Sequence, residues 1–350
     1  MKTATTLIDV AKAFATPESC LTYLEAARWP DGVRCLKCGG DKVSKFVTKD
    51  SFRNRRNRKT KQLEIVKVPA RHLYECLKPE CRHQFSATTG TIFHDTHLPI
   101  EKWFMAVALM VNAKKGLSAM QMQRDLGVTY RTAWYLCHRI RKSMEEGNPG
   151  LLAGTVEADE TFVGGRYDRR RNRGPRGQQP VFGALQRATA ESCSKIRAFP
   201  ISNASTPVIT GAVRGTISVK ADLFITDQYK PYTIVGREYR RHEAVNHIKL
   251  EYVRRGEPSI HTNSIEGFWS LFKRGLIGSF HKVSVKHLRR YLDEFSFRFN
   301  NRDCEDLFAL VVVNLLIASG IRYAELTAKP VPEEPEPPAY DGPRSSYEPW

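Results

Sequence analysis

Apolar residues recur at helical spacing in two parts of the N-terminal half of the chain. Residues 1–30 predict a short amphipathic helical segment, which Pro30 closes. Residues 99–146 are strongly helical in period, and Pro99 stands at the expected helix start. The Gly/Asn/Pro cluster at 147–150 interrupts this pattern. We therefore expect a helical region that ends, with a domain boundary, at this cluster.

Beyond that cluster the pattern changes to short runs of β type. These runs are "GTVEADETFVGG", "PVFGALQR", "KIRAFPIS" and the nearly continuous apolar run "ADLFITD". A helix is expected around 205–214, and two long helical stretches cover 262–275 and 284–301. From Pro330 onward the chain is rich in Pro and Glu and has little to bury, which predicts a disordered tail. The alternation of strands and helices indicates an α/β fold.

The chain carries a strong excess of positive charge. It has 55 Lys and Arg residues against 37 Asp and Glu, a formal net charge of +18. Such an excess indicates a polyanionic partner, most often nucleic acid, and a basic but solvated surface is the alternative. No run of about 20 apolar residues appears, and the apolar stretch at 304–318 is too short to span a bilayer. We therefore expect a nucleic-acid-binding protein without a membrane segment.

Four of the eight cysteines stand in two close pairs. The N-terminus lacks a signal-peptide pattern, so the cysteines are expected in a reducing cytoplasm, where spaced pairs favour metal over disulfides. Cys35 pairs with Cys38, and Cys76 pairs with Cys81. Loops of about two to four residues let both thiolates of a pair bind one zinc ion. We predict one structural Zn²⁺ in a zinc ribbon, because the paired spacing disfavours the alternative of four unrelated thiols.

A long basic insert lies between the two cysteine pairs. Residues 31–62 hold eleven Lys and Arg against three Asp, and most of these cations fall within 53–61. A flexible basic loop on a zinc ribbon is suited to following DNA phosphates, because each neutralised phosphate releases counterions. It would position the protein on DNA without reading the sequence. The residues expected to contact phosphates are Arg53, Arg55, Arg56, Arg58 and Lys59.

Residues 116–144 have the local pattern of a helix-turn-helix. Ser118 can cap a first helix, Gly127 permits a tight turn, and Thr129 can cap a second helix. An ordinary helical hairpin is the alternative, but the preceding zinc ribbon favours DNA binding. The side chains expected to face a DNA groove or its phosphates are Tyr130, Arg131, Arg139, Arg141 and Lys142.

Two aspartates stand on the expected strands of the β-rich region. Asp159 lies in the run "TVEADETFVGG", and Asp227 ends the buried run "ADLFITD". A carboxylate at the end of a buried strand either caps a helix or belongs to a functional site. Glu157 and Glu160 flank Asp159, and we expect at least one of them on the opposite face of the strand.

A third polar group comes from the stretch "HTNSIEGFWSLFKRG" at 261–275. Thr262 can cap a helix with an aromatic apolar side, and Asn263 and Glu266 share another face of that helix. Lys273 lies about two turns beyond Glu266. This face can present an oxygen ligand to the strand aspartates while the lysine holds a phosphate. Such oxygen ligands suit two Mg²⁺ or Mn²⁺ ions about 3.5–4 Å apart, which support in-line phosphoryl transfer.

The order and spacing of these motifs resemble a known family. The chain resembles insertion-sequence transposases of the ISXO-like type, relatives of the Merlin elements. The segments that carry this resemblance are "VEADETFVGG", "VFGALQR", "TDQYKPY", "VNHIKLEYVRR", "HTNSIEGFWSLFKRGLIGSFH" and "LDEFSFRFNNR". The cysteine-bearing segment that ends in "PIEKWF" resembles the zinc ribbon of the same proteins. The resemblance covers about residues 18–305. It implies a ribonuclease H-like core, a mixed sheet with helices on both faces, and DNA cleavage and strand transfer with two metal ions.

The resemblance implies, position by position, that Asp159 and Asp227 are the first two catalytic and metal-binding residues. The third position is described as Asn, Glu or His in this family, so both Asn263 and Glu266 stay open. Asn263 stands 36 residues after Asp227, close to the common interval, whereas six residues separate Glu266 from Lys273, the usual gap to the lysine. A charged oxygen holds Mg²⁺ better than a neutral amide, which favours Glu266.

A second basic segment, "RYDRRRNRGPRG" at 166–177, has six arginines against one aspartate. It lies between the first two core strands, and we expect a mobile loop that contacts end or target DNA, including through Arg169, Arg170 and Arg171. Further candidates for phosphate contact, with a solvated surface as the alternative, are His247, Arg254 and His261.

The main hypothesis is a bacterial, cytoplasmic and nucleoid-associated transposase. It binds the terminal inverted repeats of its element, cuts the DNA ends and joins them to target DNA, and the pairing of two ends implies a homodimer or larger assembly. A metal-dependent nuclease without strand transfer is one alternative, and a DNA-binding regulator with an inactive core is another. The expected parts are a helical segment (1–30), a zinc ribbon with basic insert (31–97), a helix-turn-helix region (98–148), a ribonuclease H-like catalytic domain (149–325) and a tail (326–350).

Overall fold

A computed structural model describes residues 6–56, 60–68, 70–147, 150–166, 176–246 and 252–328. Contacts divide the chain into two units after Gly320, and the second unit contains helix α11 (Tyr323–Thr327). The tail predicted from residue 326 therefore overlaps the end of this helix, whereas the Pro/Glu-rich stretch from Pro330 lies outside the described part. Across the described ranges, no helix has the length and apolar character that crossing a membrane requires.

Two short helices open the chain where the sequence predicts one helical segment. They are α1 (Leu7–Ala13) and α2 (Pro17–Arg28). The hydroxyl oxygens of Thr6 and Thr16 accept hydrogen bonds from the N–H groups of Asp9 and Ser19. Each bond satisfies a backbone donor that the first turn of a helix leaves unpaired. The second cap explains why a new helix starts at residue 17.

A three-stranded antiparallel sheet carries the cysteine pairs. Its strands, in spatial order, are β1 (Val43–Val47), β4 (His72–Cys76) and β5 (Gln84–Phe85). Cys76 ends β4 opposite Val43 of β1. The rings of Tyr74 and Phe85 stack with their centroids 5.6 Å apart and, with Cys35 and Cys76, form a small core.

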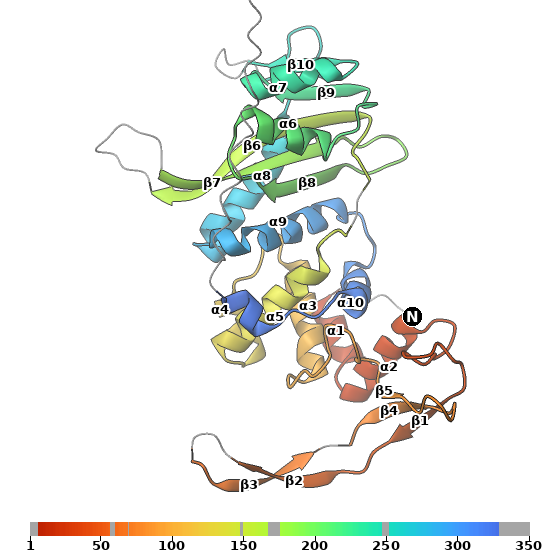
Figure 1. Ribbon diagram of the computed structural model, residues 1–350. Coiled ribbons are helices and arrows are strands. Elements are labelled where there is room, and N and C mark those ends of the chain that lie inside the picture. Colours follow the sequence, from red (N-terminus) through yellow and green to blue (C-terminus); the bar gives the residue numbers. More distant parts are fainter. Residues whose placement is uncertain are drawn as a thin grey trace, which may run out of the picture. The chain divides into compact units, whose positions relative to one another are not determined.

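The basic insert forms a two-stranded antiparallel ribbon in its described residues. Strand β2 (Ser51–Arg56) pairs with β3 (Leu63–Val68). The predicted flexible loop is therefore wrong here, because the β-branched residues Ile65 and Val66 favour a strand at β3 and give β2 a regular partner. The Thr48 N–H donates to the Arg71 carbonyl at 3.0 Å, and the Arg71 N–H donates to the Thr48 hydroxyl at 2.9 Å. These bonds lie between the β1–β4 pair and the ribbon, and Figure 1 shows β2 and β3 extending from the sheet that contains β1 and β4.

The helical region that follows has the caps that the sequence predicts. Its helices are α3 (Ile100–Asn112), α4 (Ala119–Leu126) and α5 (Tyr130–Ser143). The Ser118 hydroxyl accepts the Gln121 N–H, and the Thr129 hydroxyl accepts the Thr132 N–H. Gly127 takes a left-handed conformation with φ of 59°, which ends α4. The predicted starts of both helices are confirmed.

The apolar faces of these helices share one core with a helix from the far end of the chain. Helix α10 (Leu307–Ile317) contributes Phe308, whose ring lies 5.6 Å from that of Phe14 and 5.7 Å from that of Phe104. All three rings belong to a single cluster of buried residues. Residues 307–317 fall in the range predicted for the catalytic domain, but they pack with the N-terminal helices.

A five-stranded mixed sheet organises the second half of the chain. The strands, in spatial order, are β10 (His242–Val245), β9 (Leu223–Asp227), β6 (Thr155–Arg166), β7 (Arg176–Gln186) and β8 (Lys195–Pro200). Strand β7 is antiparallel to β6 and β8, whereas β9 is parallel to β6 and β10. The four predicted β-type runs correspond to β6, β7, β8 and β9, so these predictions are confirmed.

Helices cover both faces of this sheet, as predicted (Figure 1). Phe182 of β7 packs in a core with the helices of one face, and its neighbour Val181 packs in a core with those of the other. This alternation is expected of a strand that is buried on both faces. The helices are α6 (Thr206–Arg214) and α7 (Lys230–Val235) on the first face, and α8 (Asn263–Gly275) and α9 (Val285–Asn300) on the second.

A buried ion pair connects α5 to α9. Arg141 Nε lies 2.7 Å from Glu294 Oε2, and the two side chains are 2% and 0% exposed. The Arg141 guanidinium also lies over the Tyr291 ring, 4.1 Å from its centroid. The sequence predicts that Arg141 faces DNA, and this prediction is wrong because the side chain is enclosed between the two helices.

Candidate active site and zinc centre

The four predicted thiols come together at one place. The Sγ atoms of Cys35 and Cys81 are 3.7 Å apart, those of Cys38 and Cys76 are 3.6 Å apart, and all four lie within 4.8 Å of one another. A tetrahedral zinc ion with Zn–S distances of about 2.3 Å separates its sulfurs by about 3.8 Å. The four residues therefore fit a structural Zn²⁺ ion.

Strand register brings Asp159 and Asp227 to the same level of the sheet. Glu157 of β6 lies opposite Ile225 of the parallel strand β9. Asp159 and Asp227 each stand two residues further along, and successive residues of a strand alternate between faces. Both aspartates therefore lie on the face that α8 covers, at the carboxyl end of β9.

Asp159 is held by a tryptophan and surrounded by other carboxylates. The indole N–H of Trp269 in α8 donates a hydrogen bond of 3.1 Å to Asp159 Oδ2. Burial, followed by the nearby charges of Glu160, Asp227 and Glu266, raises the pKa of Asp159 to about 7. The site therefore concentrates negative charge where little water can screen it.

Asp227 ends β9 at the turn into α7. Its Oδ1 accepts the backbone N–H of Tyr229 at 2.9 Å. This bond orders the turn, and Tyr229 is the residue before the first turn of α7. The aspartate thus has a structural part in the turn while its charge also acts on Asp159.

Glu266 and Asn263 occupy different surroundings on α8. Glu266 is half-buried, and its Oε1 accepts the Thr262 hydroxyl at 2.8 Å. It lies one turn before Trp269, and its charge reaches Asp159. Asn263 is exposed, and its backbone N–H donates to His261 Nδ1 at 3.3 Å. Lys273, the predicted phosphate ligand, is exposed further along the helix.

The carboxylates are spread more widely than the cysteine thiols. One criterion for a tight ligand group is three or more Cys, His, Asp or Glu side chains whose ligand atoms all lie within 4.8 Å of one another. Within the described ranges, the four thiols meet this criterion and the carboxylates do not. Asp159, Asp227 and Glu266 are close enough for their charges to interact but do not form a site that tight.

Glu157 caps the helix that carries Glu266, a role that the sequence does not suggest. Thr262 stands at the cap position, but its hydroxyl is bonded to Glu266 and not to the helix backbone. Instead, Glu157 Oε2 accepts the N–H of Ile265 at 2.9 Å. Glu157 is fully buried and lies on the same strand face as Asp159. A carboxylate at a helix N-terminus is favoured by the positive end of the helix dipole.

Arg187 completes this arrangement from the end of β7. Its Nε donates to Glu157 Oε1 at 2.6 Å, and its terminal nitrogens donate to the carbonyl oxygens of Ser259 and His261 at 2.6 and 2.8 Å. The Glu157–Arg187 pair thus fixes both the start of α8 and the segment that leads into it. An acidic residue two positions before Asp159 and an arginine directly after β7 are the only sequence signals for this pair.

Glu160 lies on the opposite face of β6, as expected for one of the two glutamates beside Asp159. Its Oε2 accepts the hydroxyl of Tyr232 from α7 at 2.7 Å. Burial raises the pKa of Glu160, and the Tyr232 hydrogen bond opposes that change. Tyr232 therefore holds an acidic side chain away from the α8 face.

The predicted DNA-contacting residues fall into exposed and buried groups. Arg53, Arg55 and Arg56 are exposed on β2, and Tyr130 and Arg131 are exposed at the start of α5. Arg139 differs, because it is 9% exposed and its guanidinium lies 4.6 Å from the centroid of the Trp103 ring. This position does not fit the expected contact with DNA. Arg58, Lys59, Arg169, Arg170, Arg171 and His247 lie outside the described residues.

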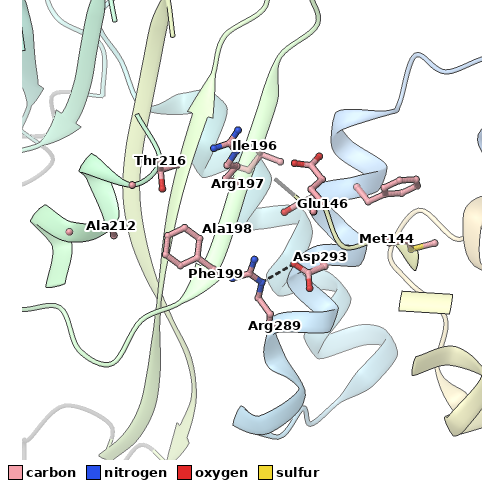
Figure 2. Close-up of a pocket in the computed structure, with 15 residues that line it drawn as sticks. Met144, Glu146, Ile196, Arg197, Ala198, Phe199, Ala212, Thr216, Arg289 and Asp293 are labelled. Atoms are coloured by element: carbon pink, nitrogen blue, oxygen red, sulfur yellow. Dashed lines mark hydrogen bonds and ion pairs between the residues drawn. The ribbon is translucent and has the colours of Figure 1, made fainter. Parts of the chain in front are cut away.

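A cavity of about 400 Å³ lies apart from the carboxylates, between β8, α6 and α9. Figure 2 shows Arg289 and Asp293 in its wall, joined by an ion pair of 3.0 Å. None of the candidate catalytic residues lines this cavity. The cavity is therefore not part of the carboxylate site.

Comparison with known proteins links both halves of the chain to transposition. Residues 151–300 match the model of the ISXO2-like transposase domain, and residues 15–84 match that of the transposase zinc-ribbon domain. A protein of Halobacterium salinarum, described as an uncharacterized protein in transposable element ISH50, is 24% identical over 298 residues. The aligned region covers 82% of this chain and 92% of that protein.

Proposed function

We propose that this chain, which belongs with the ISXO2-like transposases that carry a zinc ribbon, is the DDE-type transposase of an insertion sequence. It binds the terminal inverted repeats of its element, cuts the DNA ends and joins them to target DNA. The two matched domains and the relative from a transposable element support this reading. The observation that carries the chemistry is that Asp159 and Asp227 lie on the sheet face that α8 covers, where the charge of Glu266 from α8 acts on Asp159.

A ribonuclease H-like core is part of this proposal. The mixed sheet with helices on both faces is the architecture that such a core has in the resembling family. Strands β6 and β9 are adjacent and parallel, so residues far apart in sequence reach the same end of the sheet. A site for phosphoryl transfer at this position would draw its ligands from the sheet and from α8.

The donor set suits two Mg²⁺ or Mn²⁺ ions. Asp159, Asp227 and Glu266 offer hard carboxylate oxygens and would hold the ions. The raised pKa of Asp159, about 7, reflects a burial and charge repulsion that a divalent cation would offset. When bound, such ions activate the attacking hydroxyl and stabilise the leaving oxygen.

The chain's own groups orient the proposed ligands and the DNA. Trp269 restrains Asp159 through its indole N–H, and Thr262 restrains Glu266 through its hydroxyl. Lys273 is exposed about two turns beyond Glu266, and we propose that it binds a DNA phosphate. These groups reduce the reorganisation that the reaction would otherwise need.

Glu266 is the proposed third ligand, and Asn263 remains the alternative. Glu266 shares the surroundings of Asp159, since its charge acts on that residue and it lies one turn before Trp269. Asn263 is exposed at the first position of α8. The negative charge of Glu266 also makes it the stronger ligand for a divalent cation.

Duplex DNA is the proposed partner of the N-terminal half. The turn between α4 and α5 resembles a helix-turn-helix, in which the start of the second helix contacts base edges. Tyr130 and Arg131 are exposed at that position. Joining two DNA ends in one reaction would require a homodimer or larger assembly. The arginines at 169–171, with Arg58 and Lys59, are proposed as further contacts to phosphates.

Strand transfer with pre-cut end DNA and Mg²⁺ or Mn²⁺ tests the proposed chemistry. We expect activity in the wild type and no activity in Asp227→Asn, because the substitution removes a charged ligand. We also expect Glu266→Gln to be inactive and Asn263→Ala to keep activity. Full activity of Asp227→Asn would contradict the metal site, and the reverse pattern at 263 and 266 would make Asn263 the third ligand.

Terminal inverted repeats on either side of the gene, with short direct repeats outside them, would separate a transposase from a nuclease or a regulator. The zinc centre has its own test. We expect about one zinc ion per chain in the reduced protein, measured by elemental analysis, and loss of that zinc in Cys76→Ser. A zinc content far below that value in the wild type would contradict the centre.

A further inference from the structure

The β2–β3 ribbon exposes large apolar side chains that the zinc centre does not explain. Phe52, Leu63 and Ile65 are 69%, 73% and 75% exposed. They belong to none of the hydrophobic clusters that the described residues form. A two-stranded hairpin is only marginally stable alone, so exposing three such groups on it has a cost that a binding partner would offset.

The strand register places these three side chains on a single face of the ribbon. Phe52 is opposite Lys67, Asn54 is opposite Ile65, and Arg56 is opposite Leu63. Directly opposed residues of an antiparallel pair project to the same side, and so do residues two apart along one strand. This set of six residues, called the apolar face below, comprises Phe52, Asn54, Arg56, Leu63, Ile65 and Lys67.

The other face of the ribbon has a different composition. It presents Arg53 opposite Val66 and Arg55 opposite Glu64. Both arginines are exposed. On the apolar face, Lys67 is already paired with Asp50 at 2.6 Å, and Arg56 Nε donates to the Lys61 carbonyl at 3.0 Å. The ribbon therefore offers cations on both sides but large apolar groups mainly on one.

The composition of the apolar face matches the chemistry of base edges in the DNA major groove. Asparagine pairs with adenine, arginine pairs with guanine, and apolar side chains contact the methyl group of thymine. The major groove is about 12 Å wide and admits a two-stranded ribbon, whereas the minor groove is about 6 Å wide. Self-association through this face is disfavoured, because it would bring together basic ribbons of a chain with a net charge of +18.

We infer that the β2–β3 ribbon lies in the major groove of duplex DNA with its apolar face toward the bases, where Phe52 and Ile65 contact thymine methyl groups. The inference rests on the DNA partner of the proposed function and extends it, since the basic insert then reads base identity in addition to binding phosphates. Arg53 and Arg55, on the other face, are left to contact the phosphates that border the groove.

The test removes the thymine methyl group from the DNA and the apolar side chains from the protein. The full chain is titrated with alternating poly(dA-dT) and poly(dA-dU) duplexes, which differ only in that methyl group. Burial of one methyl group corresponds to about a fourfold change in affinity, so we expect the wild type to bind poly(dA-dT) at least that much more tightly. In Phe52→Thr/Ile65→Thr, which removes most of the apolar surface at these two positions, the preference for poly(dA-dT) should fall clearly below fourfold.

Matched controls separate this contact from general effects. Threonine favours strands, so the double variant should keep the ribbon, and its far-UV circular dichroism and zinc content should equal those of the wild type. Val66→Thr changes the neighbouring residue on the other face and should keep the full preference for poly(dA-dT). The variant comparison also removes any effect of the methyl group on DNA shape, because both proteins meet the same duplexes.

Several outcomes would overturn the inference. Equal wild-type affinity for the two duplexes would do so, and so would a preference that is undiminished in Phe52→Thr/Ile65→Thr. The double variant could also have a lower mass in solution than the wild type, with no effect of the thymine methyl group on binding. That result would instead assign the apolar face to contact with a second copy of the chain. Failure of the wild type to bind either duplex would contradict the DNA partner of the proposed function itself. The proposed function has a separate test: strand transfer by the wild type and not by Asp227→Asn would support it even if the inference about the apolar face were wrong.

Discussion

At the scale of single residues, Trp269 links the packing of the sheet to the geometry of Asp159. Its indole N–H holds the Asp159 carboxylate, and its ring packs directly against the backbone of Gly183 on the neighbouring strand. A Cβ atom at residue 183 would lie 2.5 Å from Trp269 Cζ2 and 3.3 Å from Ile265 Cδ1. Glycine is therefore required at this position for the ring to reach Asp159.

Gly183→Ala should destabilise the protein by about 1–3 kcal/mol and reduce strand transfer, because the tryptophan must move away from Asp159. Thermal unfolding and the strand-transfer assay measure the two effects. Gly211→Ala is the matched control, since nothing lies within 4 Å of a Cβ atom there and the position is inside α6. It should be neutral or stabilising by up to about 1 kcal/mol. Equal effects of the two substitutions would contradict the contact.

Glu157→Gln should lower the unfolding free energy by about 3 kcal/mol, because it leaves the charge of Arg187 without its buried partner. The glutamine can still accept the Ile265 N–H, so α8 should form, but its start should be held less firmly. Denaturant unfolding measures the loss. Glu238→Gln breaks an exposed ion pair with Arg214 and should have little effect, since exposed pairs contribute little. A loss of unfolding free energy in Glu238→Gln as large as that in Glu157→Gln would argue against a special stabilising role for the buried Glu157–Arg187 pair.

At the scale of elements, α5 has two halves with different surroundings. Tyr130 and Arg131 at its start are exposed, whereas Arg139 and Arg141 near its end are buried against Trp103 and Glu294. Helical periodicity alone assigns Arg139 to the same basic surface as Arg131. The difference arises because α3 packs against Arg139 through Trp103, whereas α9, from a distant part of the sequence, packs against Arg141 through Glu294.

Arg131→Ala should weaken binding to end DNA by about tenfold, whereas Arg139→Ala should leave affinity nearly unchanged and lower stability. The physical reason is that Arg131 is exposed toward solvent, while Arg139 stacks on Trp103 inside the protein. Affinity measured by fluorescence anisotropy, together with the unfolding midpoint of each variant, checks this prediction. Loss of affinity in Arg139→Ala with unchanged stability would reverse the assignment.

At the scale of the whole molecule, the N-terminal helices need α10 to complete their core. Phe14 and Phe104 pack against Phe308, although about 200 residues or more separate them in sequence. The chain therefore leaves the N-terminal half, builds the mixed sheet, and returns to the first core before residue 320. A boundary at 147–150 separates the sequence patterns but does not separate two independent cores.

A fragment of residues 1–150 should fail to fold into a rigid structure, because it exposes the apolar surface that α10 covers. Near-UV circular dichroism should show little signal, and an apolar dye should bind. The same fragment joined through a flexible linker to residues 305–320 should recover a cooperative transition. If the shorter fragment folds as well as the extended one, α10 is not part of that core.

The sequence predicted much of the fold where local signals are strong. The caps at Ser118 and Thr129, the four β-type runs and the long helices beginning near residues 262 and 284 all depend on short-range spacing, and the structure confirms them. The two cysteine pairs likewise identified a four-thiol cluster, since close ligand spacing is itself local. The basic insert was predicted wrongly, because its charge obscured the pairing of β2 with β3.

The sequence by itself determined which residues could do chemistry, since residue type fixes charge, ligand character and the period of an element. Only the tertiary structure decided how they are combined. It placed Asp159 beside Asp227 through parallel pairing, used Glu157 as the cap of α8, and enclosed Arg141 between two helices. These outcomes depend on contacts between segments about 70 to 150 residues apart, and nothing in a local pattern specifies which distant segment will cover a given side chain.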